Sequence, residues 1–267
     1  MTIPFRKPTQ LLIVIMTCSM ILYACATPPP AVIEADPGLL RVGLSPDAPP
    51  LIFKQNDEVS GLEAEMAMAL ADYLEKTAVF VEVPWEDQIP ALLENRTDII
   101  MSGMSINLAR KYKIEFSKPY FKSGLMIITK DLHKYAFIKN RETAFAQSIT
   151  WRIGVVKGTT GEAFIRQKST GAKAIRAFSN QDEALQALMA GRIDVFVHDA
   201  PIVLMMAAQH QAEGIKPLPI MLNDEHLAWG MRKDDPGLVE AVNAFIDQAM
   251  QKGTMQTTIK RWIPMAE

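Results

Sequence analysis

The sequence predicts an α/β fold in two lobes, each with a parallel sheet covered by helices. Short strand-like segments alternate with segments of helical period, and this alternation occurs once before and once after about residue 130. The length of 267 residues suits two lobes of ordinary size, each able to bury a core. A cleft between the lobes is therefore expected.

The first half supplies the first set of elements. A strand is expected at 40–44, followed by a loop rich in Pro and Asp at 45–50. Apolar residues at helical spacing predict a helix over 61–75. Further strands are expected at 79–83 and 98–101, with a short helix between them that contains Ile89, Leu92 and Leu93.

The second half of the chain shows the same alternation of strand-like and helical segments. Strands are expected at 151–156 and 193–197, and helices at 182–190 and from Thr160 onwards. Near the end, Asp235 and Pro236 predict the start of a long helix, and Met255, Ile259 and Trp262 predict a last one. The strand at 193–197 delivers Asp199 at its carboxyl end, where open α/β sheets bind ligands.

Composition excludes several classes of function. Hydrophobic residues make up 49% of the chain and charged residues 22%, with a formal net charge of −2, which is typical of a folded globular protein without a nucleic-acid-binding surface. The four histidines are His133, His198, His210 and His226, and none has a ligand-like partner at close spacing. We expect no metal and no organic cofactor.

The first 25 residues have the pattern of a signal peptide. Arg6 and Lys7 precede an uncharged, mostly apolar run at 11–22, which is too short to span a bilayer comfortably. The run ends in Leu22-Tyr23-Ala24-Cys25, which resembles the lipobox of bacterial lipoproteins, so Cys25 is expected to carry lipid and anchor the protein to a membrane. Residues 26–37 are expected to form a linker. The alternative is an uncleaved signal anchor, and either case places the body on the periplasmic or cell-surface side.

Three segments place small or polar residues where a strand gives way to a helix or loop. They provide one cation, amide donors at a helix start and one anion, which is the set that a free α-amino acid requires. The segments are 102–110, 157–162 and 190–199.

These segments resemble those of the family 3 periplasmic solute-binding proteins, the amino-acid-binding components of ABC importers. The resemblance covers nearly all of residues 38–263. It includes Gly103-Met104-Ser105, Arg110-Lys111, Pro119-Tyr120, Gly158-Thr159-Thr160 and Gly191-Arg192-Ile193-Asp194. It implies the type II periplasmic binding protein fold, a monomer without enzymatic activity, a small-molecule ligand in the interlobe cleft, and an ABC transporter permease as partner.

The resemblance also implies roles for single residues. Arg110 would clamp the ligand carboxylate together with Thr160, helped by Ser105 and Thr159. Asp199 and the carbonyl of Gly103 would hold the ligand ammonium, and Trp85 would pack on the ligand. Three plainer interpretations stay open: Arg110 as a surface arginine, and Asp199 or Thr160 as helix caps.

One departure from the family pattern bears on the pocket. The family often has an aromatic residue before the proline of the first loop, whereas Ala48 stands there in this chain. The change leaves room for a bulkier ligand, unless Phe53 or Trp85 compensates. The sequence does not fix the ligand's side chain.

Two other functions compete with transport. The segment 102–110 also resembles that of exported cyclohexadienyl dehydratases, which act on prephenate or arogenate. Those enzymes have a general-acid glutamate shortly after the position of Asp199, but this chain has Ala200-Pro201-Ile202-Val203, without a titratable group. The third interpretation is an accessory protein that senses a ligand for a membrane partner.

The lobes are expected to be discontinuous in sequence. Lobe 1 is expected to comprise 38–128 and 223–267, and lobe 2 the residues between, 129–222. Two crossing strands, near 125–129 and 219–223, would form the hinge.

Overall fold

The computed structural model describes residues 36–130 and 132–265. The expected signal peptide (1–25), the lipid-bearing Cys25 and the linker up to residue 35 lie outside the described residues. Within the described part of the chain, no helix has the length and hydrophobicity that a membrane crossing requires.

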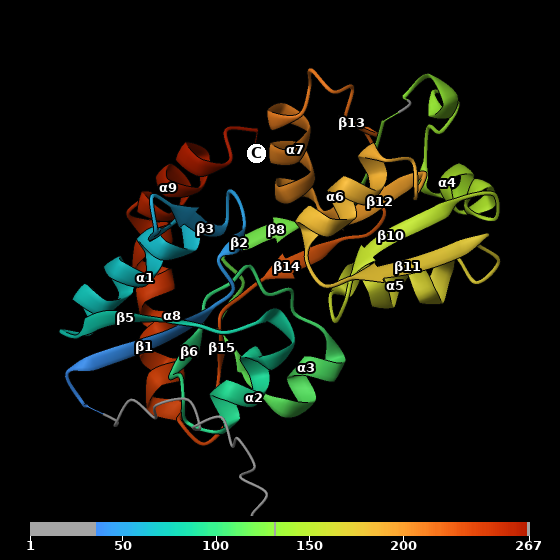
Figure 1. Cartoon of the computed structure of the whole chain (residues 1–267). Coiled ribbons are helices and arrows are strands. Elements are labelled where there is room, and N and C mark those ends of the chain that lie inside the picture. The colour runs from blue at the N-terminus through green and yellow to red at the C-terminus, as the bar shows by residue number, and fades with distance from the viewer. Residues whose placement is uncertain (1–35, 131, 266–267) are drawn as a thin grey trace, which may run out of the picture. The chain divides into compact units, whose positions relative to one another are not determined.

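Lobe 1 is built around a five-stranded sheet with the strand order β5-β1-β6-β15-β7 (Figure 1). Strand β1 pairs in parallel with β5 and β6, whereas β15 pairs antiparallel with β6 and β7. The expectation of a wholly parallel sheet is therefore wrong at this edge, because β15 returns from the far end of the sequence without a crossover helix. The strands are β1 (Leu39–Leu44), β5 (Thr77–Glu82), β6 (Ile99–Ile100), β7 (Glu115–Phe116) and β15 (Gly230–Met231).

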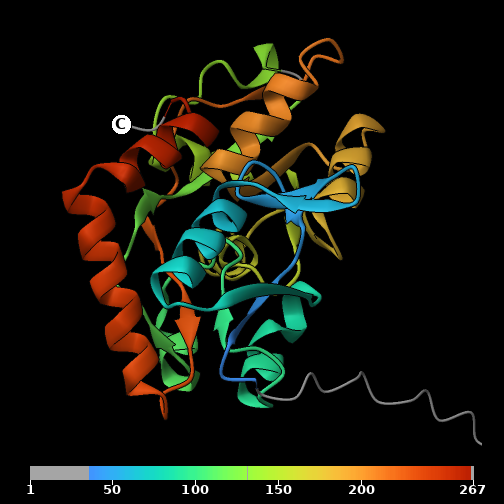
Figure 2. The ribbon, with the colours of Figure 1, turned by 90° about the vertical axis from the view of Figure 1, so that its left-hand side faces the viewer.

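The helices of lobe 1 cover this sheet, and a small three-stranded sheet precedes the first of them. The helices are α1 (Leu62–Tyr73), η1 (Trp85–Asp87), α2 (Gln88–Leu93), α3 (Leu108–Lys113), α8 (Pro236–Gln251) and α9 (Thr254–Trp262), and the small sheet comprises β2 (Asp47–Ala48), β3 (Ile52–Gln55) and β4 (Glu58–Ser60). Figure 2 shows α8 and α9 following one another along one side. The Asp235 side chain caps α8 by accepting from the Leu238 amide at 3.1 Å, as the sequence predicts.

Lobe 2 is built around a second five-stranded sheet, with the order β11-β10-β12-β9-β13. Strand β10 pairs in parallel with β11 and β12, and β9 pairs antiparallel with β12 and β13. The strands are β9 (Leu125–Thr129), β10 (Arg152–Val156), β11 (Ala174–Phe178), β12 (Val195–Asp199) and β13 (Lys216–Pro217), and the helices are η2 (His133–Tyr135), α4 (Arg141–Ser148), α5 (Thr160–Lys168), α6 (Gln181–Met189) and α7 (Ala200–Gln209).

The two sheets share one stabilising device. In lobe 1 the guanidinium of Arg41 on β1 meets both carboxylate oxygens of Asp98, with Nε at 3.1 Å and Nη2 at 2.6 Å. In lobe 2 Arg152 on β10 meets Asp194 in the same bidentate way, at 3.0 and 2.8 Å. Each aspartate lies just before the strand that pairs with the arginine's strand, so each ion pair fixes one strand junction.

The chain passes between the lobes at the two-stranded ribbon of β8 (Phe121–Ser123) and β14 (Glu225–Leu227), which pair antiparallel. The strand at 125–129 exists, but it pairs with β12 and β13 over its length and therefore lies within the second sheet. A boundary at residue 128 is thus too late. The segment 219–223 is not a strand, and Pro219 lacks an amide donor. The amide of Leu218, just before it, and that of Leu222, within it, donate to the β9 carbonyls of Ile127 and Leu125.

The two lobes share part of their core. One buried apolar cluster includes Leu51 and Met101 of lobe 1 together with Phe196 and Ile202 of lobe 2. Apolar burial of this kind stabilises the packing of the lobes against one another. The structure therefore describes an arrangement in which the lobes are in contact.

Candidate functional site

A cavity lies between the lobes at the carboxyl ends of four strands. It encloses about 450 Å³, part of it open to solvent. Ser45 follows β1, Ser102 and Gly103 follow β6, Val156 ends β10, and Asp199 ends β12. The remaining lining residues are Asp47, Ala48, Leu51, Trp85, Thr159, Gln181, His198 and Ile202. The cavity thus lies where open α/β sheets bind ligands.

Four of the seven predicted ligand-binding residues line this cavity: Trp85, Gly103, Thr159 and Asp199. The other three lie beside the cavity: Arg110 contacts Trp85 and Ser105, and Ser105 and Thr160 share the carboxylate of Glu225. The structure therefore brings residues from four separate segments of the sequence into one place.

Asp199 presents a carboxylate oxygen without a hydrogen-bond donor. The residue is 8% exposed, and its Oδ2 lies 3.0 Å from Nδ1 of His198. Its Oδ1 is buried and has no hydrogen-bond partner among the described residues. Asp199 is the N-cap residue of α7, but its side chain makes no capping hydrogen bond. A buried acceptor without a donor is costly unless a ligand satisfies it.

Gly103 is held in a left-handed conformation by a buried acid. Its φ is +68°, and its amide donates to Oε1 of Glu63 at 2.8 Å. Glu63 also accepts hydrogen bonds from the Tyr120 hydroxyl and, at 2.8 Å, from Nε1 of Trp229. Burial raises the pKa of Glu63 to about 7, even though these three donors favour the charged form. Glycine is favoured here because an L side chain rarely adopts this positive φ, and an added Cβ would also lie 2.7 Å from Cδ1 of Leu51.

Arg110 is buried and held in place by two carbonyls and an aromatic ring. It is 8% exposed, and its guanidinium donates from Nη1 to the Ser105 carbonyl at 2.8 Å and from Nη2 to the Gly158 carbonyl at 3.3 Å. Its Cζ lies 5.2 Å from the centre of the Trp85 ring. Burial lowers the pKa of Arg110, an effect that the carboxylates of Asp199 and Glu225 oppose. The interpretation as a surface arginine is therefore wrong.

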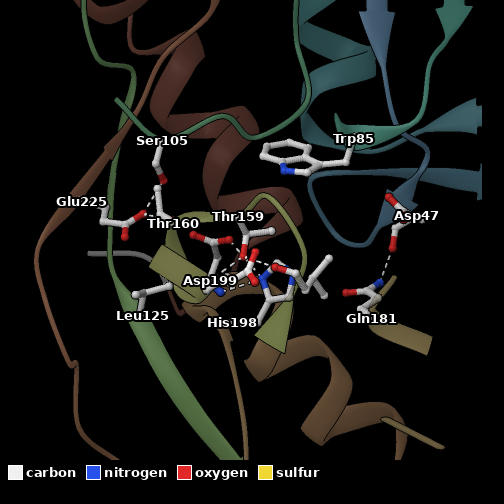
Figure 3. Close-up of polar contacts among 12 residues, drawn as sticks. Asp47, Trp85, Ser105, Leu125, Thr159, Thr160, Gln181, His198, Asp199 and Glu225 are labelled. Atoms are coloured by element: carbon white, nitrogen blue, oxygen red, sulfur yellow. Dashed lines mark hydrogen bonds and ion pairs between the residues drawn. The ribbon is translucent and has the colours of Figure 1, made fainter. Parts of the chain in front are cut away.

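Ser105 and Thr160 meet a carboxylate that the sequence analysis did not identify. Figure 3 shows both hydroxyls directed at Glu225, and each donates to its Oε2, Thr160 at 3.0 Å. Asn223 donates to the other oxygen at 2.8 Å, and Glu225 is 7% exposed. The two hydroxyl protons expected to face a ligand carboxylate are therefore directed at Glu225, which leaves oxygen lone pairs for the ligand.

Thr159, and not Thr160, caps helix α5. Its hydroxyl accepts from the Glu162 amide at 3.3 Å and donates to the Val156 carbonyl at 2.7 Å. Thr160 is the first residue of the helix, so the interpretation of Thr160 as its cap is wrong. The cap places the first free amides of α5 beside Arg110, whose guanidinium reaches Gly158.

Trp85, rather than Phe53, is the aromatic residue that lines the cavity together with Ala48. Trp85 lines the cavity, and its indole nitrogen donates to the Gly158 carbonyl of lobe 2 at 3.1 Å. Phe53 does not line the cavity and packs edge-on against Trp262 at 6.0 Å. The aromatic wall of the cavity therefore comes from the start of η1.

Sequence reasoning assigned no binding role to Asp47, Gln181, His198 or Glu225. Asp47 lies shortly after the first strand, within the segment 45–50, and His198 directly precedes Asp199, so position alone could have indicated both. Gln181 begins helix α6, and no pattern near it pointed to the cavity. Within the described residues, no group of three or more potential metal-ligating His, Cys, Asp or Glu side chains is present.

Comparison with known proteins agrees with this geometry. Residues 40–265 match the model of the bacterial extracellular solute-binding proteins, family 3. The L-cystine-binding protein TcyJ of Escherichia coli (strain K12) is 27% identical over 226 residues, which is 84% of this chain and 82% of that protein.

Two solved structures have a similar fold. One is the ancestral amino acid-binding protein AncCDT-1, described as a precursor of cyclohexadienyl dehydratase (33% identity, TM-score 0.76, 85% of this chain and 96% of that chain). The other is a binding component of an ABC transporter from Wolinella succinogenes DSM 1740, in complex with lysine (26% identity, TM-score 0.79, 85% and 96%). The fold is that of the two-lobed type II periplasmic binding proteins, as predicted. The chain belongs to the family 3 bacterial extracellular solute-binding proteins.

Proposed function

We propose that this protein captures an amino acid in the interlobe cavity outside the cytoplasm and delivers it to the permease of an ABC transporter. The observation that carries the proposal is the buried, unpaired Oδ1 of Asp199, which lines a cavity that has the buried cation Arg110 beside it. A zwitterion satisfies both charges at once. The relatives named for binding amino acids support the proposal.

The ligand's two charged groups have separate partners. The ammonium is held by Asp199 Oδ1 and the carbonyl of Gly103, with the lone pairs of Ser105 and Thr160 as further acceptors. The carboxylate is held by Arg110 and by the first amides of α5, where the helix dipole favours an anion. Trp85 packs against the bound ligand. Because Glu225 takes the two hydroxyl protons, the backbone amides replace the hydroxyls in the role that the sequence analysis gave them.

Ligand binding favours closure of the lobes, because the two sides of the cavity come from different lobes. Gly103, Arg110 and Trp85 belong to lobe 1, and Thr159 and Asp199 to lobe 2. The lobes are divided near residues 124 and 223, where the β8–β14 ribbon joins them. The proposed hinge lies at this ribbon.

The proposal extends to the protein's location. A lipid on Cys25 anchors a monomer to the membrane on the periplasmic or cell-surface side, and residues 26–37 connect the anchor to the body. Incorporation of labelled fatty acid, lost in Cys25→Ser, tests this anchoring.

The main competing function is that of a dehydratase, since one structural neighbour is described as a precursor of such an enzyme. That neighbour is itself an amino acid-binding protein. In this chain residues 200–203 have no titratable side chain that could donate a proton to a leaving group. We therefore propose binding without catalysis.

A thermal-shift screen of the purified protein against the amino acids tests the proposal. A ligand at 100 times its Kd adds about 2.7 kcal/mol of stability. Arg110→Ala and Asp199→Ala each abolish the shift, because each leaves a buried ligand charge unpaired at a cost of about 2 to 5 kcal/mol. Exposed Arg192 provides a control, since Arg192→Ala leaves the shift intact. Silence across all amino acids, together with turnover of prephenate, would refute the proposal.

A further inference from the structure

The part of the cavity remote from the Ser105–Thr160–Glu225 cluster forms a second subsite. Figure 3 shows Asp47 and Gln181 on one side of Asp199 and the cluster on the other. Asp47 comes from the short strand β2 of lobe 1 and Gln181 from the start of α6 in lobe 2. Neither residue has a part in binding the ligand's ammonium or carboxylate, so this subsite faces the ligand's side chain.

Gln181 offers the ligand an acceptor and not a donor. It is 6% exposed, and its Nε2 donates to the Asp47 carbonyl oxygen. Because that carbonyl can only accept, the amide orientation is fixed with Oε1 on the other side. Oε1 is buried and has no hydrogen-bond partner among the described residues. A ligand side chain with N–H groups would satisfy it.

The charge of the lining also favours a donor. The residues that line the cavity include the carboxylates of Asp47 and Asp199, but no lysine or arginine. Asp47 is exposed overall, and burial of part of its carboxylate raises its pKa, while Ser45 and His198 act in the opposite direction. The positively charged Lys157 pairs with Glu86 at 3.1 Å outside the lining.

A carboxylate side chain on the ligand would lie beside the Asp47 carboxylate and Gln181 Oε1, neither of which can donate a hydrogen bond to it. The lining contains no lysine or arginine that would offset this repulsion. Ala48 lines the cavity next to Asp47 and adds only a methyl group to its wall.

We propose that Asp47 and Gln181 form a side-chain subsite that selects amino acids with a cationic side chain, such as a guanidinium or an ammonium group. This inference rests on the proposed function, because it presumes that the α-amino and α-carboxyl groups occupy the Asp199 and Arg110 positions. Gln181 Oε1 accepts an N–H of the side chain, and Asp47 stabilises its charge.

Calorimetric titration with L-arginine and L-citrulline tests the inference. The two ligands have the same length and nearly the same shape, but citrulline is neutral. Arginine binds about tenfold more tightly than citrulline, which corresponds to about 1.4 kcal/mol and is modest because Asp47 is partly screened by solvent. L-Lysine binds as well, and L-glutamate does not.

Two variants test whether the charge of Asp47 causes the preference for arginine. Asp47→Asn lowers the arginine-to-citrulline affinity ratio several-fold and leaves citrulline binding nearly unchanged. Asp57→Asn removes the same charge from an exposed turn outside the cavity and leaves the ratio as in the wild type. Thermal melts of both variants check that they fold like the wild type.

The outcomes distinguish failure of the side-chain subsite from failure of the proposed function. If citrulline or L-glutamine binds as tightly as arginine, the inference is overturned while the proposed function stands. An unchanged ratio in Asp47→Asn would overturn the role of Asp47. If none of the amino acids binds, the proposed function itself fails, and the inference with it.

Discussion

Glu63 should make the protein less stable as the pH rises towards neutrality. The acid is 1% exposed and accepts hydrogen bonds from the Gly103 amide, the Tyr120 hydroxyl and the Trp229 indole. Burial raises its pKa from 4.5 to about 7. Between these two values the folded protein keeps a proton that the unfolded chain has lost. The contribution of this group is therefore complete below pH 4.5 and is lost as the pH rises through 7.

The magnitude follows from the size of the shift. Each unit of pKa corresponds to 1.36 kcal/mol, so the shift makes the free energy of unfolding fall by about 3 kcal/mol across this window. The variant Glu63→Gln does not titrate. The amide side chain of this variant keeps an oxygen that accepts from the Gly103 amide, but its NH2 group faces another donor that the carboxylate had accepted from. This mismatch lowers the free energy of unfolding by about 1 to 3 kcal/mol, independently of pH.

Urea unfolding at several pH values between 4 and 8 measures this difference, with tryptophan fluorescence as the signal. The free energy of unfolding of the wild type, minus that of Glu63→Gln, should fall by about 3 kcal/mol over the range. Exposed Glu58 provides the control, since Glu58→Gln should leave the pH dependence of the wild type unchanged. Parallel curves for the wild type and Glu63→Gln would refute the reasoning.

Three further changes test other contacts. Glu225→Gln should lower the free energy of unfolding by about 1 to 3 kcal/mol in urea, because a neutral amide replaces a buried carboxylate with three donors. Gly61→Ala should lower the melting temperature more than Gly253→Ala, because only at Gly61 would the added Cβ meet backbone, 2.5 Å from a carbonyl oxygen. The hydrogen bond from Arg152 lowers the pKa of Asp194. In thermal melts the wild type should therefore be more stable than Asp194→Asn at pH 7, and this difference should shrink below pH 4. A difference in melting temperature between the two proteins that is the same at both pH values would contradict the prediction.

The sequence alone determined the fold class, most of the elements and the principal site residues. Helical and strand periods are local properties, and they located α1, α6, α8 and β10 to within a few residues. Asp199 could be placed at a strand's carboxyl end because the strand and the proline-containing helix start are adjacent in sequence. The motifs around Gly103, Arg110 and Thr160 indicated the family before any contact was known.

Only the tertiary structure decided how the cavity is lined. Glu225 lies 120 residues from Ser105 and 65 from Thr160, and Gln181 lies 134 residues from Asp47. These pairs meet because the chain crosses twice between the lobes and the lobes close on one another, and no local pattern encodes that geometry. Burial of Arg110 and the pKa of Glu63 are likewise decided by surrounding atoms from distant segments, which desolvate the charged groups.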